Sequence, residues 1–206
     1  NINNTVTFSG DLFLGTQAKA FTYLDQGWNL VGNPYVSGLD WDAVIIPSGL
    51  SNEVHYIDAA SGNDLSYVKL VGGTGSRYIA PMQGFFVKAS GSGSLSFGNA
   101  QRTHLGADNF YKADIHDLLI LEASGENYSD QTWIFFNELA EVEHDGVFDA
   151  YKRISTSNPE LPQIYSITPS GSMLSINGMT ETTMVPLGFI AVQSGEFTIS
   201  AIETSE

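Results

Sequence analysis

Cysteine does not occur among the 206 residues of the chain. Its absence excludes disulfides, thiolate metal ligands and cysteine nucleophiles. Charged side chains are scarce, at 15% of residues against about a quarter in an average globular chain. No apolar run in the sequence approaches the roughly 20 residues that a membrane-spanning helix needs. We therefore expect no membrane insertion.

The sequence motifs of common catalytic sites are also absent. The chain has no G-x-S-x-G elbow, no H-E-x-x-H helix and no P-loop. Its four histidines are scattered and never stand at metal-ligand spacing. We therefore predict that the protein is not an enzyme and requires no cofactor. A hydrolase that draws two carboxylates from distant strands is the alternative that such motifs do not exclude.

Basic residues are few, with eight lysines and arginines against 23 aspartates and glutamates. The imbalance is concentrated in residues 107–206, which hold sixteen acids and three bases. Such a surface repels phosphate backbones, so we expect no nucleic-acid partner. A cation or a neutral ligand such as a glycan is compatible with it.

Short runs that alternate apolar and polar residues, separated by glycine, asparagine and serine, indicate β-strands along the whole chain. Closely spaced short strands are typical of sandwiches and jelly rolls. The polar segment 98–109 lacks this pattern. We therefore predict an all-β fold of two tandem β-sandwich domains, jelly-roll or Greek-key-like, over residues 1–104 and 105–206. The predicted strands lie near residues 4–14, 19–24, 28–32, 53–58, 65–70, 84–89, 94–97, 117–123, 131–137, 148–153 and 163–168.

The segment GWNLVGNPYVSGLDW, residues 27–41, is the most sharply patterned part of the chain. Its strand is predicted to place Trp28 and Leu30 in the core, with Val31 as a further candidate, and the following Gly-Asn-Pro breaks that strand. A serine that can cap a helix and a later proline then bound one short helix near residues 38–45. That helix is predicted to bury Trp41.

Two similar motifs stand near the ends of the two halves. One is P-x-x-G-F-F-V-K-A-S-G at residues 81–91, and the other is P-x-G-F-I-A-V-Q-S-G at residues 186–195. Each is followed by another strand pattern. Both halves are therefore predicted to end in a similar hairpin, the second turning at Ser194–Gly195. A further hairpin is predicted to turn at Pro169–Gly171.

Acidic side chains gather between residues 138 and 149 with no base among them. Glu141, Glu143, Asp145 and Asp149 surround a flexible His-Asp-Gly turn. Calcium takes about six to eight oxygen ligands in flexible geometry. These four residues are therefore the predicted ligands of a structural calcium ion, with a solvated acidic loop as the alternative.

Aromatic side chains provide the candidates for glycan binding, because sugar rings stack on exposed aromatic faces. Tyr35 and Tyr78, flanked by proline, glycine and arginine, are predicted to be exposed rings. Trp41 is a third candidate, although its apolar neighbours favour core packing. Trp28 and Trp133 lie within apolar strand patterns and are predicted to be core residues.

The motifs GWNLVGNPYVSGLDW at residues 27–41 and IAPMQGFFVKASGSGSLSFGNAQRTH at residues 79–104 resemble a module common in secreted and surface proteins of the Bacteroidetes. The resemblance is to the β-rich region directly upstream of a C-terminal sorting domain that the type IX secretion system reads. LLILEASGENYSDQTWIFFNE and DGVFDAYK in the second half fit it as well. It implies export across the outer membrane, a secreted or cell-surface location, and a non-catalytic position beside other domains. It carries no catalytic residues.

Three functions of different classes follow. The first is a non-catalytic accessory module of a secreted or cell-surface multidomain protein, stabilising or positioning its neighbours and mediating surface attachment. The second is a carbohydrate-binding module attached to a polysaccharide-degrading enzyme, and the third is a hydrolase. Because the chain begins at Asn1 without methionine, we expect a piece of a longer precursor, whose other domains are its partners.

Overall fold

A computed structural model describes residues 10–12, 14–104, 117–180 and 184–204. The regular elements among them are β-strands and three-residue 3-10 helices, which confirms the all-β prediction. The strands of the first half are β1 (Gln17–Phe21), β2 (Trp28–Gly32), β3 (Gly38–Asp40), β4 (Leu50–Ile57), β5 (Asp64–Val68), β6 (Tyr78–Ile79), β7 (Gly84–Ala89), β8 (Gly93–Phe97) and β9 (Arg102–Thr103). The 3-10 helices are η1 (Asp25–Gly27), η2 (Trp41–Ala43) and η3 (Asn99–Gln101).

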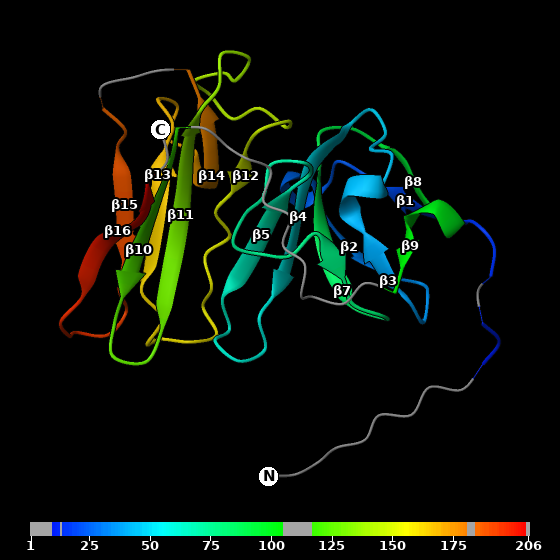
Figure 1. Cartoon of the computed structure of the whole chain (residues 1–206), viewed down its shortest axis with the longest axis horizontal. Helices are drawn as coiled ribbons and strands as arrows, with labels where there is room; N and C mark the ends of the chain where they lie inside the picture. Colours follow the sequence, from blue (N-terminus) through cyan, green and yellow to red (C-terminus); the bar gives the residue numbers. More distant parts are fainter. Residues whose placement is uncertain (1–9, 13, 105–116, 181–183, 205–206) are drawn as a thin grey trace, which may run out of the picture.

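The second half contains the strands β10 (Leu118–Ser124), β11 (Ser129–Phe136), β12 (Ala150–Tyr151), β13 (Gln163–Ile167), β14 (Met173–Met179), β15 (Leu187–Ile190) and β16 (Thr198–Thr204). Figure 1 shows the two sets of strands side by side, with β5 of the first half next to the second set. None of the helices in the described ranges has the length and apolar content to cross a bilayer.

The first half surrounds a single apolar core with three small sheets. Their orders are β2-β7-β4-β5, β1-β8 and β6-β3-β9. Phe21, Leu39, Phe85 and Phe97 enter the core from the different sheets, and Trp41 of η2 joins them. Because layers of strands face one another across these side chains, the half is of the sandwich type.

The second half is one seven-stranded sheet in the order β15-β13-β14-β11-β10-β16, with β12 paired to β14. Strands β11 and β14 run parallel, and the other pairs are antiparallel. Its core contains Ile120, Trp133, Phe135 and Ile176. Val68 of β5 is fully buried in this same core. Apolar packing therefore continues across the junction between the two halves.

The predicted domain boundary between residues 104 and 105 lies at the edge of segment 105–116, outside the described residues. None of the described sheets combines strands from both sides of that segment. The predicted strand 4–14 also lies mostly outside the described residues.

The predicted short helix near residues 38–45 is wrong. Gly38–Asp40 form strand β3, and only Trp41–Ala43 turn, as the 3-10 helix η2. The physical reason is that β3 is the central strand of its sheet, bonded to β6 on one side and β9 on the other. Those pairings use the backbone groups that a helix would need.

Strand β2 lies where the sequence predicts it, but of its three core candidates only Val31 is buried. Val31 is buried in the core, whereas Leu30 is 69% exposed. Trp28 shares the face of Leu30 and is only partly buried. Alternation gives the two faces of a strand but not which of them meets the core.

The predicted hairpins at the ends of the two halves do not form. Strand β7 pairs with β2 and β4, while β8 pairs with β1. In the second half β15 pairs with β13, while β16 pairs with β10. In both halves, therefore, the two consecutive strands do not pair with each other but with different neighbours. The hairpin over Pro169–Gly171 is confirmed, since β13 and β14 pair antiparallel.

Candidate functional site

The sheet β2-β7-β4-β5 has one apolar face and one polar face. Val54 and Phe85 lie on the first face and pack in the core. Alternation along β4 places Glu53 and His55 on the opposite face, where Asp64 of β5 joins them. This polar face meets the second half of the chain, since β5 packs against β12 and β14. Buried charged side chains of β4 and β5 therefore lie at the junction.

Four charged side chains form a continuous network across this junction. The ring Nδ1 of His55 lies 2.6 Å from Asp64 Oδ2, and Nε2 lies 2.8 Å from Glu53 Oε2. Arg153 of the second half donates from a guanidinium nitrogen to Asp64 Oδ1 at 2.6 Å. The backbone N–H of Tyr151 donates to Glu53 Oε2 at 2.9 Å. Both carboxylates of the first half thus bind groups of the second half.

The protonation states of the network follow from its contacts. Burial alone would lower the pKa of His55, but its hydrogen bonds to Asp64 and Glu53 raise that pKa to about 9. Burial alone would raise the pKa of Glu53, but its contacts with His144 and His55 lower it to about 2. At neutral pH His55 is therefore an imidazolium that donates from both ring nitrogens to carboxylates.

Trp28 lies against this network and links it to two further cations. Its ring meets the His55 ring edge-on, with 5.0 Å between the centroids. The Lys88 ammonium lies 4.8 Å from the centre of the Trp28 ring, and the Arg153 guanidinium lies 5.1 Å from it. Lys88 is also 4.6 Å from the centre of the Tyr151 ring. Aromatic faces attract cations in this geometry, so Trp28 stabilises the charges of the junction.

A second set of polar contacts crosses the junction nearby. Asn63 donates from its side chain to Asp130 Oδ1 at 2.9 Å. The other oxygen of Asp130 accepts from Lys152, and both of these side chains are buried. The hydroxyls of Ser66 and Ser175 lie 2.8 Å apart. Because buried polar groups need partners, these contacts fix how the two halves meet.

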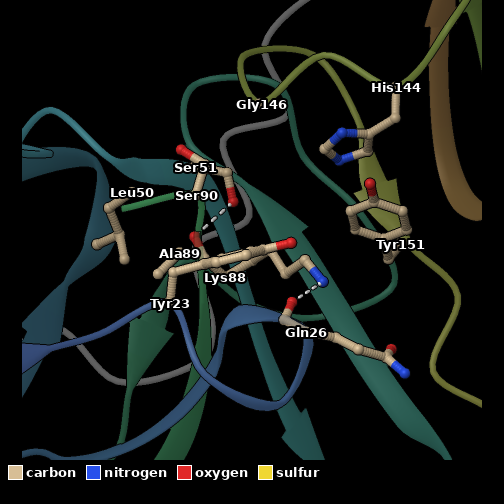
Figure 2. Close-up of a pocket in the computed structure, with 10 residues that line it drawn as sticks. All are labelled: Tyr23, Gln26, Leu50, Ser51, Lys88, Ala89, Ser90, His144, Gly146 and Tyr151. Atoms are coloured by element: carbon tan, nitrogen blue, oxygen red, sulfur yellow. Dashed lines mark hydrogen bonds between the residues drawn. The ribbon is translucent and has the colours of Figure 1, made fainter. Parts of the chain in front are cut away.

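A cavity of about 430 Å³ opens beside the charged network; we call it the junction cleft. Aromatic, hydroxyl and amide side chains line it together with one lysine and one histidine: Tyr23, Gln26, Leu50, Ser51, Lys88, Ala89, Ser90, His144, Gly146 and Tyr151. Figure 2 shows Tyr23 and Lys88 on one side of it and Tyr151 and His144 on the other. None of the residues that line it is acidic.

Both halves build the cleft. Ser51 lies on β4, Lys88 on β7 and Tyr151 on β12, so sheet strands hold these three side chains. The loop that carries His144 is tied to β4, because Asn52 donates its backbone N–H to the carbonyl of Gly146 at 2.7 Å. The cleft is therefore formed by fixed elements of both halves.

His144 connects the cleft to the buried network. Its ring stacks on Tyr151 at a centroid distance of 3.9 Å. Its Nε2 lies 3.7 Å from Glu53 Oε1, which is too long for a hydrogen bond. This buried nitrogen has no hydrogen-bond partner within the described residues.

The model of one protein family, a domain of unknown function (DUF8693), matches residues 48–205. The chain belongs to this family. The matched range runs from β4 to β16 and includes both sides of the junction. Comparison with curated proteins and with solved structures gives no match.

The structure places two of the three predicted ligand-binding aromatics in the core. Tyr35 is 1% exposed, and its hydroxyl lies 2.8 Å from the carbonyl oxygens of Gly15 and Phe97. Trp41 is fully buried and donates from its ring nitrogen to a backbone carbonyl. The prediction of an exposed Tyr35 ring is wrong, because the turn after β2 folds inward. Tyr78 is partly buried beneath the Arg77 guanidinium.

Three of the four predicted calcium ligands use their carboxylates to accept hydrogen bonds from other groups of the protein. Asp145 accepts from the backbone N–H groups of Val147 and Phe148, and Asp149 accepts from those of Asp145 and Gly178. Glu143 accepts from a serine hydroxyl, and Glu141 uses its backbone N–H as a donor to Asp145. Among the described residues no group of three or more histidine and acidic side chains could hold a metal ion. Calcium binding stays a prediction.

Asp149 is the buried member of this acidic loop. Burial raises its pKa to about 7, although the N–H groups of Asp145 and Gly178 oppose that shift. The carboxyl group therefore ties the acidic loop to β14, because it accepts hydrogen bonds from the N–H groups of Asp145 and Gly178.

Sequence reasoning missed the network itself. The Glu-Val-His stretch at residues 53–55 puts two ionisable groups on one strand face, which is a signal that the local sequence does contain. Lys152 and Arg153 are two of only three bases after residue 106. No local pattern, however, shows that Arg153 meets Asp64, because 89 positions separate them.

Proposed function

We propose that this chain is a non-catalytic accessory module of a secreted or cell-surface multidomain protein. It positions the neighbouring domains and contributes to surface attachment. One observation carries the proposal: the charged network of Glu53, His55, Asp64 and Arg153 locks the two halves together. A module that sets the distance between its neighbours needs this kind of internal rigidity.

The energetics of buried charge explain why the network favours rigidity. If the halves rotated against each other, Arg153 would leave Asp64 and Tyr151 would leave Glu53. Each carboxylate would keep its contact with His55 but lose its partner from the second half, and a hydrogen bond to a charged group contributes roughly 1.5–3 kcal/mol. A second arrangement of the halves is therefore strongly disfavoured.

The position of the acids supports a role without catalysis. Glu53 and Asp149 have pKa values of about 2 and about 7, the separation that an acid–base pair of a hydrolase requires. Both side chains, however, are fully buried, so no substrate oxygen reaches them. The junction cleft, which a substrate could enter, has no acidic residue in its lining.

Distance measurements between two spin labels test the rigidity. The chain has no cysteine, so Ser94→Cys and Ser200→Cys place one label on an exposed strand of each half. We expect a single narrow distance distribution. The double variant Arg153→Met/Asp64→Asn should broaden it, whereas Lys19→Met, on the exposed edge of β1, should not. A broad distribution of label distances in the protein with its charged network intact would contradict the positioning role.

Activity measurements test the absence of catalysis. We expect no release of reducing ends from plant or algal polysaccharides. Turnover that disappears in Glu53→Gln or Asp149→Asn, with an unchanged circular dichroism spectrum, would overturn this part of the proposal.

We extend the proposal to export by the type IX pathway, for which the support is the resemblance of the motifs at residues 27–41 and 79–104. Fractionation of cells that carry the full precursor tests it. The protein should reach the surface or medium in a secretion-competent strain and accumulate inside the cell when the pathway is deleted. Equal export from both strains would contradict the extension.

Carbohydrate binding is the second candidate function, and the junction cleft favours it. Tyr23 and Tyr151 offer aromatic surface, while Gln26 and Ser90 offer hydrogen-bonding groups beside it. Clefts that bind small molecules combine these features.

A further inference from the structure

We propose that the junction cleft binds an acidic saccharide, a sugar that carries a carboxylate or a sulfate group. The inference rests on carbohydrate binding, the second candidate function, and names its ligand class. Three properties of the cleft support it: its charge, its free donors and its aromatic surface.

The charge of the cleft is opposite to that of the chain. The chain has 23 acidic residues and a net charge of −15, yet the lining of the cleft contains a lysine, a histidine and no acid. The buried acid Glu53, whose charge acts on Lys88, is paired with the His55 imidazolium through a 2.8 Å contact. Approaching anions are therefore repelled by most of this surface and attracted at the cleft.

Lys88 is the group that would bind the anion. Its ammonium donates to the carbonyl of Gln26 and lies over the rings of Trp28 and Tyr151. These contacts leave N–H donors of the ammonium unused. Within the described parts of the chain, no carboxylate forms a salt bridge with Lys88. A ligand carboxylate or sulfate would complete this site with a charge-assisted hydrogen bond.

The remaining lining fits a sugar better than a simple anion. Tyr23 is 60% exposed, so its ring is free to stack on a sugar face, and Figure 2 shows it reaching into the cleft beside Lys88. Ser90 and Gln26 are exposed and can bind hydroxyl groups. The volume of about 430 Å³ lies within the range of roughly 300–1,000 Å³ of small-molecule sites.

Titration calorimetry at physiological salt tests the inference. The probes are an oligogalacturonate and a sulfated carrageenan oligosaccharide, with a neutral galacto-oligosaccharide of equal length for comparison. We expect at least one acidic probe to bind and the neutral probe to bind at least tenfold more weakly. Lys88→Gln should reduce acidic binding at least tenfold, and Tyr23→Ala at least fivefold.

Matched variants separate a specific site from general attraction. Lys19→Gln removes an exposed lysine of β1 and should leave binding unchanged, as should Tyr128→Ala, between β10 and β11 and not among the residues that line the cleft. All variants are checked for an unchanged melting temperature. If Lys19→Gln weakens binding as much as Lys88→Gln, or a glutamate-rich peptide binds as well, the inference is overturned.

The two levels of the proposal fail in different ways. Binding of the neutral probe as tightly as the acidic ones, unaffected by Lys88→Gln, would overturn the acidic ligand and leave carbohydrate binding standing. Absence of binding to all three probes would contradict both.

Discussion

Asn33 shows at the scale of a residue why the motif Gly-Asn-Pro-Tyr has a structural role. Its side-chain amide is 2% exposed after β2. It donates to the carbonyls of Ser37 and Ala80, each at 2.9 Å, and accepts from the backbone N–H of Tyr35 at 3.0 Å. One side chain thus satisfies several buried backbone groups that the turn leaves without partners.

Replacing Asn33 by alanine should therefore be costly. The change leaves buried carbonyls and an N–H group unpaired, and each such group costs roughly 1–3 kcal/mol. We expect urea denaturation of Asn33→Ala to show a loss of about 3 kcal/mol or more. Asn127→Ala, at an exposed asparagine, is the control and should be near neutral. A midpoint for Asn33→Ala equal to that of the control would refute this role.

Lys152 and Asp130 form a buried ion pair that tests the energetics of charge at the junction. Removing one partner of such a pair costs roughly 3–5 kcal/mol, because the other charge stays buried. We expect Lys152→Met to lower the free energy of unfolding by roughly this amount, seen as a lower urea midpoint. The double variant Lys152→Met/Asp130→Asn should recover part of the loss, since it removes the remaining charge. A double variant less stable than either single one would contradict the explanation.

Strand β2 shows at the scale of an element how one glycine sets the start of a strand. Gly27 has a φ of +85°, and a Cβ there would lie 2.0 Å from the carbonyl oxygen of Ala89. That carbonyl belongs to β7, the neighbour of β2. The close approach of the two backbones therefore depends on a residue without a side chain.

The same strand provides its own control for this conclusion. We expect Gly27→Ala to destabilise the protein by several kcal/mol. An alanine would be strained at this positive φ, and its Cβ would clash with the carbonyl oxygen of Ala89. At Gly32, the other end of β2, a Cβ would meet nothing within 4 Å, so Gly32→Ala should be tolerated. Thermal melts compare the two. Equal melting temperatures would disprove the steric argument.

Element-scale patterns predicted where strands lie but not how they pair. Alternation located β2, β7 and β13 closely, because it reflects the local geometry of an extended chain. The two Gly-Phe motifs predicted hairpins, yet β15 and β16 lie at opposite edges of the same sheet. Pairing depends on which distant strand offers a matching face, and no local window contains that information.

At the scale of the whole molecule, the charged network couples stability to pH. The pKa of His55 is about 9 in the folded protein and 6.5 in the unfolded chain. The charged His55 therefore stabilises the fold fully at pH values below 6.5. This contribution disappears as the pH rises through about 9. Glu53, with its pKa lowered to about 2, contributes fully above 4.5 and loses its effect as the pH falls through about 2. Asp149 acts oppositely and reduces stability as the pH rises from 3.8 to about 7.

We therefore expect the free energy of unfolding to fall between pH 6.5 and 9.5, by on the order of 3 kcal/mol at most from His55, and the urea midpoint to fall with it. Titration of the histidine ring signals by NMR assigns the effect, since His55 should titrate near pH 9. His104→Gln, at an exposed histidine, should keep the same pH dependence. A flat midpoint across this range, or a His55 pKa below 6.5, would rule out a charged His55.

The sequence by itself determined the class of the fold, the positions of most strands and the absence of cysteine chemistry. Each of these depends on composition or on the period of two along an extended chain, which are local properties. Only the tertiary structure decided that Leu30 faces solvent, that Tyr35 is buried and that Glu53, His55 and Asp64 meet Arg153. Those outcomes depend on contacts between residues as many as 98 positions apart, as between Glu53 and Tyr151. Burial of Tyr35 arises when the strands of the first half pack around their own core, whereas the charged network and the junction cleft arise when the two halves pack together.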